Sequence, residues 1–354
     1  MDCWGRKLLW LVESGEVPES CIDEAVRRIL RVKFLLGLFE DPYADVPRAR
    51  AIRNCRGHRA IARRAAQESI VLLKNDGGLL PLADKVSSIA VVGPNADVAQ
   101  LGNYSGWNEE LVTPLEGIRN RVPRGVSVLH ARGCGLWNAD KSGFVEAVDA
   151  ARKCDVAVVV IGESTEICTE GTDTHDLELA GVQLDLLKAI HATGTPTAVC
   201  LVNGRQLAIP WIAENVPAVL EMWFGGEEQG NALANVLFGD VNPSGKLPLS
   251  IPRSTGHLPS FYNKKPSALG AYKEPGTSDK PGRDYVFSSP TPLFEFGFGL
   301  SYTQFEYSEL NITPAIISRT GEVTVSVNVA NVGKVRGAEV VQLYLNDVYS
   351  SVET

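Results

Sequence analysis

The chain has 354 residues, of which 44% are apolar and 21% charged, so its composition is that of an ordinary globular protein with one or two domains. No apolar run approaches the roughly 20 residues that a membrane-spanning helix needs. The net charge of -8, with lysines and arginines scattered along the chain, provides no basic stripe for a polyanion. We therefore expect neither a membrane nor a nucleic acid as a partner.

Seven cysteines are spread along the chain without CxxC or Cys/His spacing, which argues against a zinc site or a disulfide framework. A GxGxxG or GxxxxGK[ST] motif after a strand is also absent. We expect no metal and no cofactor.

The first forty residues predict two helices joined by a short turn. Trp4, Leu8 and Leu11 share one face of the first helix, Gly15 ends it, and residues 20–24 offer a capping box for the second. No strand accompanies them, so their apolar faces must pack on something else. Residues 1–17 have the pattern of an amphipathic helix and not that of a secretion signal.

A helix predicted over residues 51–66 leads into a short apolar stretch, 67–82, with a Gly-Gly turn. From there strand and helix patterns alternate. Strands are predicted at 89–92, 126–130, 156–161, 197–202 and 218–222. Helices are predicted at 143–153, 182–192, 206–214 and 229–237. This alternation is typical of βαβ units, which form a mostly parallel sheet covered on both faces.

The character of the sequence changes after residue 239. Residues 239–300 are rich in Pro, Gly and Ser, and loops of this length are usually functional or disordered. Beyond them, alternating valines at 323–329 and an apolar run at 340–345 predict strands that begin a β-sandwich.

Eight segments spaced through nearly the whole chain resemble glycoside hydrolase family 3, which contains many β-glucosidases and β-xylosidases. They are IDEAVRRILRVKFLLGLFEDPY (22–43), ESIVLLKNDGGLLPL (68–82), IAVVGPNAD (89–97), LGNYSG (101–106), TPLEGI (113–118), VLFGDVNPSGKLPLSIPR (236–253), FEFGFGLSYTQFEYS (294–308) and GAEVVQLYLND (337–347). Because the eight occur in the family's order, the resemblance is specific.

The resemblance implies an architecture for the chain. Residues 1–50 would be the terminal helices and linker of a (β/α)8 barrel, and 51–255 a mostly parallel α/β sandwich domain. Residues 256–301 would be a Pro/Gly-rich connection, and 302–354 the start of an incomplete fibronectin III-like β-sandwich. On this comparison we expect both ends of the chain to be truncated.

Acidic residues gather in the segment that follows the predicted strand 156–161. Five acids and one histidine lie among its fourteen residues, 163–176: Glu163, Glu166, Glu170, Asp173, His175 and Asp176. Ligands collect at the carboxyl ends of strands in open α/β sheets, so this loop is the candidate site.

In family 3 the acid/base is a glutamate on such a loop, and the resemblance places Glu170 of CTEGTDTHDLELAGVQ (168–183) in that position. Thr174 and Ala180 depart from the family's usual arginine and proline. Glu166 and Glu163 remain alternatives. The family's nucleophile is a barrel aspartate in a Ser-Asp-Trp-like motif that this sequence lacks.

Four other residues are candidates for sugar contact or support. His175 could touch a sugar hydroxyl, although a loop histidine is more often just exposed. Arg205 could hold an acidic partner, which we take as a structural role. Trp107 and Trp223 could stack on a sugar face, but a lone tryptophan usually packs in the core or at an interface.

The sequence therefore predicts part of a retaining exo-acting β-glycosidase that hydrolyses β-glucosides or β-xylosides, is secreted or periplasmic as the family commonly is, and is inactive alone without the nucleophile. Its partner would be an oligosaccharide or an aryl or alkyl glycoside. The alternative is a non-catalytic α/β module that binds a carbohydrate or a protein. The choice among glucose, xylose and arabinose, and the oligomeric state, stay open.

Overall fold

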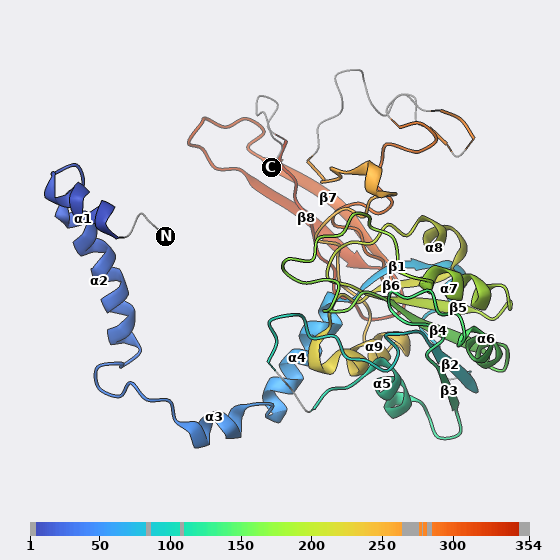
Figure 1. Cartoon of the computed structure of the whole chain (residues 1–354). Helices are drawn as coiled ribbons and strands as arrows, with labels where there is room; N and C mark the ends of the chain where they lie inside the picture. Colours follow the sequence, from blue (N-terminus) through green and yellow to red (C-terminus); the bar gives the residue numbers. More distant parts are fainter. Residues whose placement is uncertain are drawn as a thin grey trace. The chain divides into compact units, whose positions relative to one another are not determined.

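The structure is a computed structural model that describes residues 5–82, 86–106, 110–263, 276–277, 279–281 and 285–346. The chain divides into two compact units, one up to His58 and one from Arg59 onward (Figure 1). Within the described residues no helix is both long and apolar enough to cross a bilayer.

The first unit is helical, as predicted for its first forty residues. It contains α1 (Arg6–Glu13), α2 (Glu19–Leu35), α3 (Val46–Ile52) and the first residues of α4 (Arg56–Ser69). The capping box predicted at residues 20–24 is wrong, because α2 starts earlier: Pro18 is its N-cap in extended conformation and makes no side-chain cap hydrogen bond. Apolar side chains on α2 are exposed, Phe34 by 61% and Leu35 by 75%.

The continuous helix predicted over residues 51–66 is also wrong. The chain leaves the helical conformation at Arg53, and Asn54 has a φ of 53°, which breaks the segment into α3 and α4. Asn tolerates the left-handed region better than other residues with a Cβ, and this explains why the break occurs there.

The second unit is organised around a six-stranded sheet in the order β1-β6-β5-β4-β2-β3 (Figure 1). The strands are β1 (Val71–Asn75), β2 (Ser88–Val92), β3 (Ser127–Ala131), β4 (Val156–Gly162), β5 (Thr197–Val202) and β6 (Ala218–Glu221). All neighbours are parallel except β1, which pairs antiparallel with β6 at the edge. The five predicted strands are confirmed, whereas β1 was not recognised because its apolar residues directly follow a helix.

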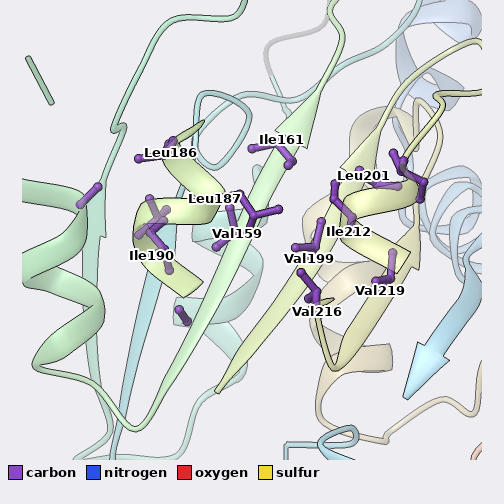
Figure 2. Packing of buried hydrophobic residues seen from close by; sticks show 14 of the residues in the cluster. Val159, Ile161, Leu186, Leu187, Ile190, Val199, Leu201, Ile212, Val216 and Val219 are labelled. Carbon is purple, nitrogen blue, oxygen red and sulfur yellow. The ribbon is translucent and has the colours of Figure 1, made fainter. Parts of the chain in front are cut away.

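Helices cover both faces of the sheet. Every residue of β4 and β5 is buried, and successive residues alternate between two hydrophobic clusters. One cluster contains side chains of α6 (Phe144–Arg152), α7 (Gln183–His191) and α8 (Pro210–Asn215); the other contains side chains of α4, α5 (Pro114–Arg121) and α9 (Gln229–Leu237). Figure 2 shows Leu186, Leu187 and Ile190 of α7 beside Val159 and Ile161 of β4. Burial on both faces explains the continuous apolar runs from which these strands were predicted.

Three short 3-10 turns, Asp76–Gly78, Gly226–Glu228 and Thr255–His257, and an antiparallel hairpin of β7 (Phe305–Thr313) and β8 (Thr324–Asn331) complete the described elements. The predicted strand at 340–345 is wrong: these residues are in no strand, and no strand partner pairs with them in the described part of the chain. An apolar run alone does not make a strand without a neighbour that pairs with its backbone hydrogen-bonding groups. The fibronectin III-like domain and the domain boundaries stay predictions.

Two strands end in glycines that allow the backbone of the next strand to come close. Gly93 after β2 has a φ of 124°, and Gly162 at the end of β4 has a φ of 137°. A Cβ on Gly93 would lie 2.1 Å from the carbonyl oxygen of Val160, and a Cβ on Gly162 would lie 2.1 Å from that of Val202. Neither position accepts a side chain, so both close approaches depend on glycine.

We expect Gly162→Ala to lower the free energy of unfolding by about 3 kcal/mol or more, because it combines backbone strain with a collision against a rigid strand. Urea denaturation measures the change. Gly256→Ala is the matched control, since that glycine has an ordinary φ and its nearest neighbour is 3.8 Å away. Equal stability of the two variants would contradict the close approach described above.

Candidate active site

The strand order of the sheet reverses between β2 and β4. From β2 the chain continues to β3 on one side of the sheet, whereas from β4 it continues to β5 on the other side. Such a point, outside the carboxyl ends of two adjacent parallel strands, is where open α/β sheets bind ligands. The loop after β2 and the acidic loop after β4 therefore follow neighbouring parallel strands at the same edge of the sheet.

Buried amides tie these two loops together. Asn95, fully buried, donates from Nδ2 to the carbonyl oxygen of Glu163 at 3.0 Å. Gln100 donates from Nε2 to Oδ1 of Asn95 at 3.0 Å, and its Oε1 accepts from the backbone N–H of Thr165 at 3.3 Å. The start of the acidic loop is thus held by hydrogen bonds from its neighbour.

The three candidate glutamates lie in different surroundings. Glu163 is 7% exposed; its Oε1 lies 3.0 Å from Nε of Arg205, and its Oε2 makes no hydrogen bond. Glu166 is exposed. Glu170 is also exposed, and Oε2 of its carboxylate accepts a hydrogen bond from the hydroxyl of Tyr104, which raises the pKa of Tyr104. Tyr104 comes from the loop after β2, so Tyr104 and Glu170 join the two loops a second time.

A cavity of about 490 Å³ opens beside the acidic loop. Glu163, Glu166, His175, Arg205 and Trp137 are among its lining residues, and Glu170 is not. The structure therefore brings two of the candidate glutamates and the candidate histidine to one cavity, and leaves Glu170 on the outer part of the loop.

The remaining candidates are placed as follows. The side chain of His175 is 96% exposed and its Nε2 lies 3.0 Å from Asp176, in agreement with the expectation of an exposed histidine. Trp223 is half-buried and packs against the core, as a lone tryptophan usually does. Trp107 lies outside the described residues.

Arg205 holds an acidic partner, as predicted, and that partner is Glu163. Its guanidinium also donates from Nη2 to the carbonyl oxygen of Ile167 and from Nη1 to that of Thr172, the latter at 3.4 Å. Cys168 lies in the same environment: burial raises the pKa of its thiol, and the negative charge of Glu163 raises it further.

Sequence reasoning missed a second buried acid, Glu221, at the end of β6. Its Oε1 accepts from the backbone N–H of Trp223 at 3.1 Å, and Nδ2 of the fully buried Asn203 lies 3.3 Å from Oε2. Complete burial raises the pKa of Glu221 to about 8, against the lowering effect of these hydrogen bonds. The signal in the sequence was an ionisable residue at the end of an otherwise apolar strand.

The described residues contain no group of three or more His, Cys, Asp or Glu side chains arranged to hold a metal ion. The polar groups of the acidic loop and its neighbours include carboxylates, amides, the guanidinium of Arg205, the imidazole of His175 and the phenol of Tyr104. This set suits the recognition of hydroxyl groups and proton transfer.

Comparison with known proteins identifies the family. Residues 70–302 match the family model described as the glycosyl hydrolase family 3 C-terminal domain, a range that contains the whole six-stranded sheet. The chain belongs to glycosyl hydrolase family 3.

Relatives of this family 3 chain carry two kinds of name. It is 45% identical over 340 residues to a β-xylosidase of Formosa agariphila, covering 94% of this chain and 46% of the relative. It is 39% identical to a periplasmic β-glucosidase of Salmonella typhimurium, covering 99% of this chain and 49% of the relative. The chain thus spans about half the length of the curated relatives it matches.

A solved structure shows the same fold. The β-glucosidase of Listeria innocua in complex with glucose superimposes with a TM-score of 0.81 at 35% identity, over 98% of this chain and 47% of that one.

Glu221 generates a prediction about pH and stability. The unfolded chain releases this proton near pH 4.5, whereas the folded chain keeps it up to about pH 8, so the wild type loses stability as the pH rises between these values. We expect Glu221→Gln, which stays neutral, to match the wild type near pH 4.5 and to exceed its free energy of unfolding by about 4 kcal/mol at pH 8.

Urea titrations of both proteins across this pH range provide the measurement, with Glu178→Gln, at an exposed position, as the control. A difference between Glu221→Gln and the wild type that does not change with pH would show that Glu221 is not held neutral by the fold.

Proposed function

We propose that this chain supplies the acid/base glutamate, Glu170, of a retaining exo-acting β-glycosidase that hydrolyses the O-glycosidic bonds of β-glucosides or β-xylosides. The observation that carries the proposal is the family match over residues 70–302, which includes the acidic loop at the reversal of strand order. Relatives named β-xylosidase and β-glucosidase support both substrate classes.

The proposed chemistry requires two carboxyl groups about 5 to 5.5 Å apart. One attacks the anomeric carbon and forms a glycosyl-enzyme; the other, Glu170, protonates the departing oxygen and then takes a proton from the water that releases the sugar. The exposure of Glu170 supports this role, because its carboxyl group is free to meet a substrate. The hydroxyl of Tyr104 donates to its carboxylate form and orients it.

The surroundings of the two alternatives support them less. Glu163 is buried and paired with Arg205, so its Oε1 already has a fixed cationic partner. Glu166 is exposed and lines the cavity, and it is the alternative that the experiment below must separate from Glu170. His175, exposed beside the same cavity, is proposed as a contact for a sugar hydroxyl.

The nucleophile is proposed to come from sequence outside this chain. The family's Ser-Asp-Trp-like motif is absent from the 354 residues, and the relatives are about twice as long as the matched region. In this proposal residues 1–50 are helices and linker of a barrel, and residues 302–354 begin a fibronectin III-like domain. Exposed apolar side chains on α2, β7 and β8 support additional packing partners for both regions. The name of the Salmonella relative supports a periplasmic or secreted protein.

The chain by itself should release no nitrophenol above background from aryl β-glucosides or β-xylosides, because half of the carboxyl pair is missing. A chromogenic assay at high protein concentration measures this. Turnover comparable to that of an intact glycosidase would contradict the external nucleophile. Binding of a sugar or protein without turnover, even when a nucleophile-bearing domain is supplied, would favour the alternative of a non-catalytic module.

In an enzyme that combines this chain with the nucleophile-bearing domain, Glu170→Ala should slow the hydrolysis of disaccharides by about 10²- to 10⁴-fold. Aryl glycosides with good leaving groups should be affected much less, because their departing oxygen needs no proton. Azide should accelerate the variant and yield a β-glycosyl azide. Glu146→Ala, at an exposed position of α6, is the control. If Glu166→Ala shows this pattern and Glu170→Ala does not, the assignment belongs to Glu166.

A further inference from the structure

Arg205 reaches the acidic loop from the neighbouring strand. It follows β5 by three residues, whereas the acidic loop follows β4, and the two strands are parallel neighbours. The side chain of Arg205 is 20% exposed, so most of it lies between the strand ends. It is therefore positioned to act on the loop without contacting the outer solvent face where Glu170 lies.

The contacts of Arg205 enclose the part of the loop that carries Glu170. The guanidinium donates to the carbonyl oxygens of Ile167 and Thr172, and these two residues bracket the tetrapeptide 168–171. Within that bracket the chain turns tightly, since the backbone N–H of Thr172 donates to the carbonyl oxygen of Thr169 at 3.2 Å. Glu170 lies inside a turn that one cation holds at both ends.

Arg205 is itself held in place by buried neighbours. Nε of Arg205 lies 3.0 Å from Oε1 of the buried Glu163, and Nδ2 of Asn203 donates to the carbonyl oxygen of Arg205 at 2.7 Å. Gly204 permits the backbone before Arg205 to lie close to the turn, because a Cβ at this position would lie 2.7 Å from Sγ of Cys168. The ion pair with Glu163, the hydrogen bond from Asn203 and the absence of a side chain at Gly204 together keep the guanidinium beside the turn 168–171.

We propose that Arg205 is the positioning residue for the acid/base glutamate: with Glu163 as its buried counter-ion, it holds the turn 168–171 so that the carboxyl group of Glu170 stays in line with the departing oxygen. This inference rests on the proposed function of Glu170. Proton transfer is sensitive to placement, and a displacement of about 1 Å can cost on the order of 10²-fold in rate. Because Glu170 is exposed on a loop, the position of its carboxyl group depends on the backbone of the turn 168–171.

The first experiment uses this chain alone and tests, without catalysis, whether Arg205 holds the turn 168–171. Hydrogen exchange with mass spectrometry should show that Arg205→Ala removes protection from the amides of the loop 163–176, while β2, β4 and β5 keep theirs. Arg205→Lys keeps the charge but loses the planar fork that reaches two carbonyls, so it should restore protection only in part. Arg253→Ala is the matched control, since Arg253 also donates to backbone carbonyls, those of Thr291 and Pro292, away from this loop.

The second experiment uses the enzyme completed with the nucleophile-bearing domain. Arg205→Ala should reduce kcat for disaccharides at least ~10-fold more than kcat for dinitrophenyl glycosides, the leaving-group dependence of a misplaced acid. A merely structural role would reduce both substrates alike, and Arg253→Ala should leave their ratio unchanged.

The two arms separate the possible failures. If the amides of the loop 163–176 exchange at the same rate in Arg205→Ala as in the wild type, Arg205 does not hold the turn and the inference is wrong. If Glu170→Ala shows the leaving-group dependence and Arg205→Ala does not, positioning by Arg205 is wrong and the proposed function stands. If neither variant shows it, the proposed function fails and the positioning inference fails with it.

Discussion

The burial of β4 on both faces is the constraint on which the site depends. β4 contains no exposed and no ionisable residue, so the first ionisable residue after Ile161 and Gly162 lies at the carboxyl end of the strand, at the sheet's edge. The strand order reverses between β2 and β4 at that edge, the place where open α/β sheets bind ligands. Packing in the core thereby decides where the chemistry of the chain can be.

Two buried acids, Glu163 and Glu221, are accommodated in opposite ways. Glu163 is paired with the guanidinium of Arg205, whereas burial without a cation raises the pKa of Glu221 to about 8 and keeps it protonated near neutral pH. The negative charge of Glu163 contributes to that shift. Two unpaired carboxylates in so small a region would be costly, and the fold avoids this by neutralising one with a cation and the other with a proton.

Much of the sheet could be predicted from sequence, because strands buried on both faces leave continuous apolar runs. β5 is predicted to the residue, and β4 to within one. α5 was not recognised, although Thr113 and Glu116 form the reciprocal capping box that the sequence analysis looked for elsewhere. Pairing was the harder problem: β1 and residues 340–345 have similar apolar patterns, yet only β1 has a neighbouring strand edge to bond to.

At the site, sequence reasoning found the acidic loop and the pairing role of Arg205, but it could not rank the glutamates by environment. Burial, the contact of Tyr104 with Glu170 and the neutral state of Glu221 all depend on residues from other loops and strands. Such long-range contacts leave no periodic signal in the local sequence.

The link between Asn95 and residue 163 has a consequence for how this site can change. Asn95 binds the carbonyl group of residue 163, and Gln100 accepts from the amide of Thr165, so both attachments use the backbone. Substitutions that alter the side chains of the acidic loop therefore leave these two attachments in place, whereas a change at Glu170 removes the contact with Tyr104. The loop can accept new side chains at this edge while the path of its first residues stays the same.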